Sequence, residues 1–160
     1  MLTFDRRAAP GTPPTGTLTL PCEARRRSRQ KVTLDSGEEA GVMLAWGESL
    51  RHGDLIASTE GRVVRVVAAD EPVLLIRCSH PRELARVAYH LGNRHVAVEV
   101  GEGTLKIAPD HVLRAMVEGL GAKVERANLP FDPEAGAYGA HGHPPHDRVG
   151  RLIGGGKQAS

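Results

Sequence analysis

Short apolar stretches with a period of two dominate the first half of the chain. Leucine and threonine alternate over residues 17–20, Val32 and Leu34 alternate around Thr33, and a valine-rich stretch follows over residues 63–67. Clusters of turn-forming residues separate these stretches, a pattern that is typical of an all-β unit. We therefore predict an all-β domain over residues 17–71. Residues 1–16, which contain the segment AAPGTPPTG, are expected to be a disordered lead-in.

The hydrophobic pattern changes after Asp70-Glu71-Pro72. Apolar runs and strict alternation now flank two stretches whose apolar residues recur at i, i+3, i+4 and i+7, the spacing of an amphipathic helix. The expected elements are a strand over residues 73–78, a helix around 84–91, strands over 96–100 and 105–108, a helix around 113–120 and a strand over 123–127. Asp110 is a good N-cap for the second helix, and Gly92 and Gly121 are expected to end the two helices.

This order is β-α-β-β-α-β, which predicts a ferredoxin-like domain over residues 72–128 and an α+β fold for the whole chain. Such a domain carries two helices on one face of a four-stranded sheet and leaves the other face open. Domains this small are marginally stable alone, so we expect a homodimer through the open face. Residues 129–160 are rich in glycine and proline and are expected to be a flexible tail.

Composition and charge narrow the class of protein. Lysine and arginine total 21 against 19 acidic residues, and a formal net charge of only +2 does not favour a general nucleic-acid binder. No apolar run approaches the roughly 20 residues that a membrane span needs. Cys22 and Cys78 cannot form a disulfide framework or a Cys-x-x-Cys site, so a reducing cytoplasm fits best.

The residues with the clearest ligand chemistry are histidines. Three of the eight lie close together in the Pro/Gly-rich tail: His141, His143 and His146. Imidazole is the commonest ligand for borderline metals such as Zn²⁺, Ni²⁺ and Cu²⁺. A flexible tail could fold these rings around an ion that a rigid wall holds from one side. The alternative is a polar tail whose histidines are incidental.

Two further histidines stand where a ring could reach a metal. His95 opens the predicted strand 96–100 and would face the open side of the sheet, and two His95 rings would meet if a two-fold axis passed there. His111 lies in the first turn of the second helix, where the helix dipole disfavours the imidazolium. Each could instead be a solvated surface histidine. The remaining histidines are interpreted as structural or turn residues: His52, His80 and His90.

Two other functions compete with metal binding. The segment Arg25–Lys31 carries five positive charges in seven residues and could contact RNA or a ribosome, although no aromatic residue is interleaved for base stacking. A zinc-dependent hydrolase would need three fixed ligands and an open water position. No G-x-S-x-G or H-E-x-x-H motif is present, so we name no catalytic residue and expect no enzyme.

Several segments of the chain resemble one known family. They are YHLGNRH at residues 89–95, DHVL at 110–113 and LPFDPEAGAYG at 129–139. In these segments, and over about residues 18–146, the chain is similar to the nickel metallochaperones among the urease accessory proteins.

The resemblance implies a fold and a function. The first domain would be of peptide-binding type, and the second would bind metal and dimerise. The histidine of Gly-Asn-Arg-His carries over to His95 as an interfacial nickel ligand, and that of Asp-His-Val-Leu carries over to His111 as an accessory ligand. The tail ligands would be His141, His143 and His146. The protein would deliver Ni²⁺ to apo-urease together with other accessory proteins, including a GTPase, and Zn²⁺ or Cu²⁺ could occupy the same site. No nucleic acid or membrane is implied.

Overall fold

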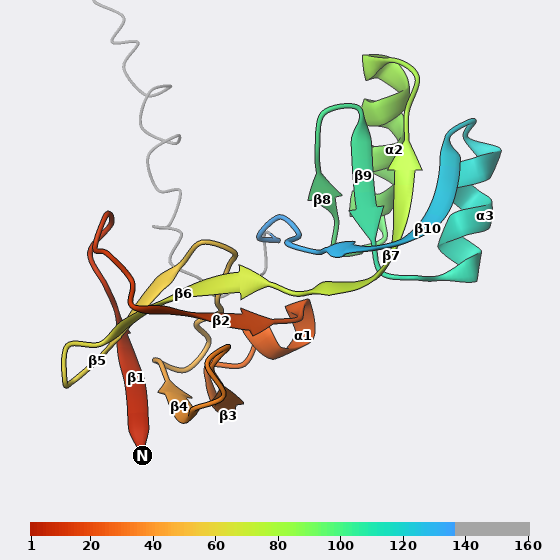
Figure 1. Cartoon of the computed structure of the whole chain (residues 1–160). Coiled ribbons are helices and arrows are strands. Elements are labelled where there is room, and N and C mark those ends of the chain that lie inside the picture. The colour runs from red at the N-terminus through yellow and green to blue at the C-terminus, as the bar shows by residue number, and fades with distance from the viewer. Residues whose placement is uncertain (137–160) are drawn as a thin grey trace, which may run out of the picture.

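The computed structural model describes residues 1–136. They form two β-sheets (Figure 1). The sheets are joined directly, because only Ala69 separates the last strand of the first sheet from the first strand of the second. No helix within this range is both long enough and apolar enough to cross a membrane.

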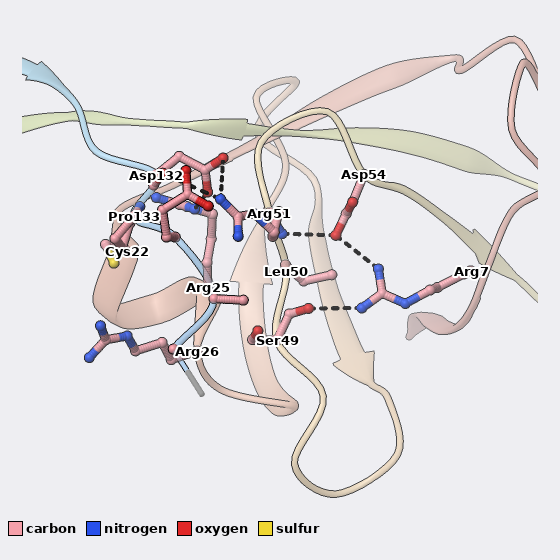
Figure 2. A pocket seen from close by; sticks show the side chains of 13 residues that line it. Arg7, Cys22, Arg25, Arg26, Ser49, Leu50, Arg51, Asp54, Asp132 and Pro133 are labelled. Carbon is pink, nitrogen blue, oxygen red and sulfur yellow. Dashed lines mark hydrogen bonds and ion pairs between the residues drawn. The ribbon is translucent and has the colours of Figure 1, made fainter. Parts of the chain in front are cut away.

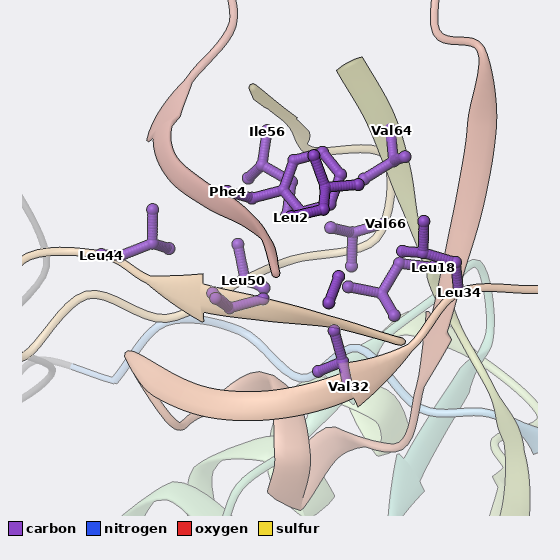
Figure 3. Packing of buried hydrophobic residues seen from close by; sticks show 12 residues of the cluster. Leu2, Phe4, Leu18, Val32, Leu34, Leu44, Leu50, Ile56, Val64 and Val66 are labelled. Atoms are coloured by element: carbon purple, nitrogen blue, oxygen red, sulfur yellow. The ribbon is translucent and has the colours of Figure 1, made fainter. Parts of the chain in front are cut away.

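The first sheet has six strands in the order β2-β6-β5-β1-β4-β3. Its elements are β1 (Leu2–Arg7), β2 (Gly16–Leu20), the short helix α1 (Cys22–Arg25), β3 (Arg29–Thr33), β4 (Glu39–Met43), β5 (Leu55–Ser58) and β6 (Val63–Ala68). The aliphatic side chains that alternate along these strands meet in one core, as Figure 3 shows around Phe4, Leu18 and Val66.

The expected disordered lead-in over residues 1–16 is wrong at its start. Residues 2–7 form β1, which pairs with β4 on one side and β5 on the other, and Phe4 is completely buried. The reason is the alternation of Leu2, Thr3 and Phe4, which is short but apolar on one face. The proline-rich residues 8–15 are a loop between β1 and β2.

Hydrogen bonds at Asp35 bring the two edge strands of the first sheet together. The Asp35 N–H donates to the Thr17 carbonyl oxygen at 3.1 Å. Its carboxylate accepts from Thr17 Oγ1 at 2.5 Å, Thr19 Oγ1 at 2.7 Å and the Thr19 N–H at 3.2 Å. Because Thr17 and Thr19 belong to β2 and Asp35 follows β3, the sheet curls toward a barrel.

The second sheet has four strands in the order β10-β7-β9-β8, the strand order of a ferredoxin-like β-α-β-β-α-β unit. The elements are β7 (Asp70–Arg77), α2 (Pro81–Asn93), β8 (Glu99–Val100), β9 (Thr104–Ile107), α3 (His111–Gly119) and β10 (Lys123–Pro130). Side chains of β7 and β9 form a core with both helices. The predicted α+β fold, with an all-β part followed by a ferredoxin-like part, is confirmed. The expected limits 72 and 128 cut two residues from β7 and from β10.

The helix starts follow the sequence signals. Pro81 begins α2 after His80, whose Nδ1 accepts from the Glu83 N–H at 3.2 Å. The Asp110 carboxylate caps α3 by accepting from the N–H groups of Val112 and Leu113, both at 2.9 Å. Gly121, with φ of 100°, ends α3 as expected.

The predicted strand over residues 96–100 is shorter than expected. β8 contains only Glu99 and Val100, and residues 96–98 have no regular structure. The expected alternation nevertheless holds, since Val96 and Val98 pack on the helix-side core and Ala97 packs on the opposite side with Val73.

The expected open face of the second sheet is covered in part by the chain itself. Cys22 from α1 and Phe131 pack on Val73, with Ala127 and Leu129 of β10 beside them. Residues 131–136, here called the strap, turn back after β10 and lie next to the start of β8 (Figure 1). The sequence pattern missed this contact because both covering residues come from outside the predicted domain.

Candidate functional site

His95 occupies a special backbone position at the end of α2. Its φ is 57°, in the left-handed region, and no other non-glycine residue of the described range has a positive φ. The His95 N–H donates to the Gly92 carbonyl oxygen at 3.0 Å, and the Val96 N–H donates to the Leu91 carbonyl oxygen at 3.4 Å. These two bonds define a Schellman motif, in which glycine is the usual residue at the left-handed position.

This geometry corrects the expectation that Gly92 ends the helix. Gly92 is still helical, and the chain reverses three residues later at His95. A left-handed backbone costs an L-residue about 1 kcal/mol or more relative to glycine. Such outliers concentrate at functional sites, so the histidine at this position is a candidate for function.

The His95 side chain is exposed and lines an open cavity of about 620 Å³. The apolar wall of this cavity comes from the end of α2 and from the chain that leads into β8, including Val96 and Val98. Its polar rim includes Arg26 of the first sheet's loops and Glu134 of the strap, and Gly136 also lines it. The last described residue of the chain therefore lies beside the same cavity as His95.

His111 lies near the opposite edge of the second sheet from His95. It is the first residue of α3 and is exposed. α3 packs against β10, which is one edge strand, whereas His95 leads into β8, which is the other. Within residues 1–136 no three His, Cys, Asp or Glu side chains gather as a metal-binding group. The predicted tail ligands His141, His143 and His146 lie outside the described residues.

The other described histidines have structural partners. His52 Nδ1 accepts from the Ala68 N–H at 3.1 Å, and His80 caps α2. The His90 ring meets the Tyr89 ring edge-on, with 5.4 Å between centroids. These contacts agree with the interpretation of the three residues as structural.

A second cavity, of about 500 Å³, lies at the junction of the two sheets (Figure 2). Arg25 of α1 is buried there, with only 2% of the residue exposed. Its guanidinium pairs with Asp132 Oδ1 at 2.9 Å and donates to the carbonyl oxygens of Phe131 and Leu20. Arg51 approaches the same carboxylate at 3.4 Å. Arg25 is therefore part of an interdomain contact, so the basic segment Arg25–Lys31 is not one continuous solvent-exposed patch.

The strap is also bonded to the second sheet. The Asp132 N–H donates to Glu99 Oε1 at 2.7 Å, and the Glu134 N–H donates to the Val98 carbonyl oxygen at 2.8 Å. Lys106 Nζ pairs with Glu99 Oε2 at 2.7 Å and donates to the Pro130 carbonyl oxygen at 2.8 Å. These bonds hold residues 130–134 in place and so fix where the chain beyond Gly136 begins.

The two cysteines are poor candidates for ligands. Burial raises the pKa of the Cys22 thiol, which packs between the two sheets, and burial also raises the pKa of the Cys78 thiol. Metal binding requires the thiolate, which a raised pKa disfavours.

Two family models match the chain. UreE urease accessory protein, N-terminal domain, matches residues 4–69, and UreE urease accessory protein, C-terminal domain, matches residues 71–151. The chain belongs to the UreE family of urease accessory proteins. The C-terminal match extends beyond Gly136 and includes the three tail histidines.

Relatives of about 50% identity share this assignment. A urease accessory protein UreE from Nitrosospira multiformis is 48% identical over 146 residues, which is 91% of this chain and 83% of the relative. A UreE from Pseudomonas putida is 51% identical over 144 residues, 89% of each chain. A UreE from Burkholderia thailandensis is 50% identical over 153 residues, 89% of this chain and 72% of the relative. The predicted resemblance to urease accessory proteins is confirmed.

The sequence analysis did not predict the residues that surround His95 or those that hold the strap in place. Glu134 lines the His95 cavity, and Arg25 with Asp132 holds the strap. The acidic residues of the segment FDPEAG offered a signal for the strap, but nothing local to Arg25 indicates its distant partner.

Proposed function

We propose that this UreE family member binds Ni²⁺ and delivers it to apo-urease during assembly of the urease metal centre. Family membership supports the link to urease. The single observation that carries the nickel-binding part is the placement of His95, an exposed imidazole at a left-handed helix end. Glycine is the usual residue at this position, so the histidine is best accounted for by the chemistry of its ring.

The site we propose is shared between two copies of the chain. Nickel binds four to six ligands in planar or octahedral arrangements, and His95 supplies one imidazole per chain. A homodimer axis near His95 would bring two rings to one ion. His141, His143 and His146 of the tail would complete the coordination, and His111 would be an accessory ligand. Zn²⁺ and Cu²⁺ would compete for the same imidazoles, because affinity order at such sites does not favour nickel.

The proposed role is that of a carrier with no catalytic activity. Its partners would be the urease apoprotein and other accessory proteins, including a GTPase, and its location would be the cytoplasm. Few ligands on an exposed surface favour exchange of the ion, which delivery requires. No nucleic acid and no membrane enter this proposal.

Transfer of nickel to purified apo-urease tests the function. The nickel-loaded chain should raise urease activity in the presence of a chelator that removes free Ni²⁺. His95→Ala should lose most of this effect, His111→Ala should lose only part of it, and His52→Ala is the matched control that should retain it. A His95→Ala chain that activates urease as well as the unaltered chain would reject the proposed site.

A further inference from the structure

The strap brings a carboxylate to the cavity that His95 lines. Of the described residues around this cavity, Glu134 is the one acid and Arg26 is the one with a permanent positive charge. A cavity that held the Arg26 charge alone would repel a divalent cation. The Glu134 carboxylate offsets that charge, so it makes the cavity suitable for a metal ion.

Backbone hydrogen bonds fix the place of Glu134 relative to His95. The Glu134 N–H donates to the Val98 carbonyl oxygen at 2.8 Å. Val98 follows His95 by three residues, which span at most about 10 Å of extended chain. A histidine and a glutamate side chain with an ion between them can bridge such a separation. The Asp132 N–H, bonded to Glu99 Oε1 at 2.7 Å, holds the strap just before this point.

The Glu134 carboxylate is not used to hold the fold. Within residues 1–136 no cation pairs with it. The other acids of this region have structural partners. Glu99 accepts from the Asp132 N–H with one oxygen and pairs with Lys106 through the other, and the Asp132 carboxylate pairs with Arg25. Glu134 therefore differs from its acidic neighbours in being exposed and available to a ligand.

The surroundings suit a charged contact with a metal ion. Val96, Val98 and Val100 contribute apolar surface to the cavity, and an apolar surrounding strengthens the attraction between a carboxylate and a cation. Planar and tetragonal sites of mixed nitrogen and oxygen ligands are typical of Ni²⁺ and Cu²⁺. A two-fold axis that brings two His95 rings together also brings two Glu134 carboxylates to the same place. Two imidazoles and two carboxylates make four ligands.

We propose that Glu134 supplies an oxygen ligand to the nickel ion that His95 binds, with one glutamate from each chain of the dimer. This role rests on the nickel binding proposed for His95 and adds a ligand outside the histidines. The tail histidines would then occupy the remaining positions around the ion. The first Ni²⁺ would be held mainly by residues of the second sheet and the strap.

Nickel titration of charge-matched variants of the whole chain tests this ligand. Glu134→Gln keeps the size of the side chain and should bind the first Ni²⁺ at least about tenfold more weakly, since even residues that only orient metal ligands typically contribute that much. Glu102→Gln removes the same charge from an exposed turn between β8 and β9 and should stay within about twofold. Both variants should remain dimers with unchanged melting temperatures.

Glu134→His separates ligation from simple charge. The new imidazole is neutral but can bind nickel, so this variant should bind the first Ni²⁺ as tightly as the unaltered chain or more tightly. X-ray absorption of the nickel-loaded dimer should show more imidazole rings around the ion than in the unaltered chain. If Glu134 acted through its charge alone, Glu134→His would weaken binding as much as Glu134→Gln and would add no ring.

Three results would overturn the assignment of Glu134. They are unchanged affinity of Glu134→Gln, equal weakening by Glu102→Gln, and an unchanged number of imidazole rings in Glu134→His. The His95→Gly variant in the same titration tests the underlying function separately. If His95→Gly loses the first Ni²⁺ and Glu134→Gln retains it, the histidine site stands and only the oxygen ligand is rejected. If His95→Gly retains it, the proposed nickel site itself is rejected.

Discussion

Two regions lie at the same end of the second sheet but are built in opposite ways. One is the domain junction, where Arg25 meets Asp132, and the other is the corner at the end of α2, where His95 lies. At the junction, Arg25 is buried and each nitrogen of its guanidinium meets a carboxylate or a carbonyl oxygen. At the corner, His95 is exposed and holds a backbone angle that favours glycine. The first region is organised for rigidity and the second for access, and the strap connects them through Asp132 and Glu134.

This difference suggests how a carrier can combine order with exchange. A buried charge with several partners cannot leave its position without a large penalty. An exposed imidazole can bind and release a metal without disturbing the core. The comparison can be tested by altering each region separately.

The largest effect is expected at the junction. Arg25→Met should lower the free energy of unfolding by about 3 kcal/mol, because it removes one partner of a buried pair and leaves the Asp132 carboxylate and the Phe131 carbonyl oxygen less well bonded. Arg77→Met is the matched control, since its pair with Glu125 is more than half exposed and should contribute less than about 0.5 kcal/mol. Urea unfolding measures both, and equal losses would show that the junction is not a special source of stability.

A smaller effect on stability is expected at the corner, where substitution by glycine should be less harmful than substitution by alanine. His95→Gly should be more stable than His95→Ala by about 1 kcal/mol, because glycine adopts a left-handed backbone without strain. The end of α3 provides the reverse control: Gly121→Ala should destabilise by a similar amount, since Gly121 has the same role at φ of 100°. Metal-free unfolding in urea measures these differences. Equal stability of the glycine and alanine variants would contradict the claim that the left-handed backbone at position 95 is strained for residues other than glycine.

Asp35 should make a still smaller, pH-dependent contribution. Burial alone would raise the pKa of this carboxyl, but hydrogen bonds from Thr17 and Thr19 lower it below the ordinary value of 3.8. A lowered folded-state pKa gives stability that is present above the unfolded pKa and is lost as pH falls through the folded value. Asp35→Asn should therefore be less stable than the unaltered chain at pH 7, and the gap should close as the pH falls below 3.8. Thermal unfolding across this pH range measures it, and a gap that widens in acid would be evidence against the assignment.

Removal of the end of the chain should leave metal-free stability unchanged. Deletion of residues 142–160 removes His143 and His146 but no residue of the two described sheets. We expect the same melting temperature and the same dimeric state as for the whole chain, with fewer metal equivalents bound. Loss of the dimer on this deletion would mean that these residues hold the subunits together.

Local patterns predicted most of the fold because its elements carry their own signals. Asp110 marked the start of α3, and the order of strands and helices was enough for the ferredoxin-like topology. The shortness of the Leu2–Phe4 alternation concealed β1. The end of α2 was misplaced because Gly92 is a stronger stop signal than a histidine three residues later.

The candidate site was only partly predictable for a different reason. His95 could be named from its segment, but the backbone geometry that exposes it depends on where α2 ends. Arg25 and Asp132 lie 107 residues apart in the sequence, so no local pattern relates them. The partial cover over the sheet face and the fixed path of the strap both depend on this distant pair.

Nickel titration of the His95→Gly variant tests the central claim most directly. Glycine suits the backbone at this position, so a loss of binding could not be attributed to a disturbed fold. Calorimetric titration with Ni²⁺, combined with the mass in solution, should show one tight site per dimer for the unaltered chain and for the His52→Ala control. The account predicts that the His95→Gly dimer lacks this site. A His95→Gly dimer that binds its first Ni²⁺ as tightly as the unaltered chain would contradict it.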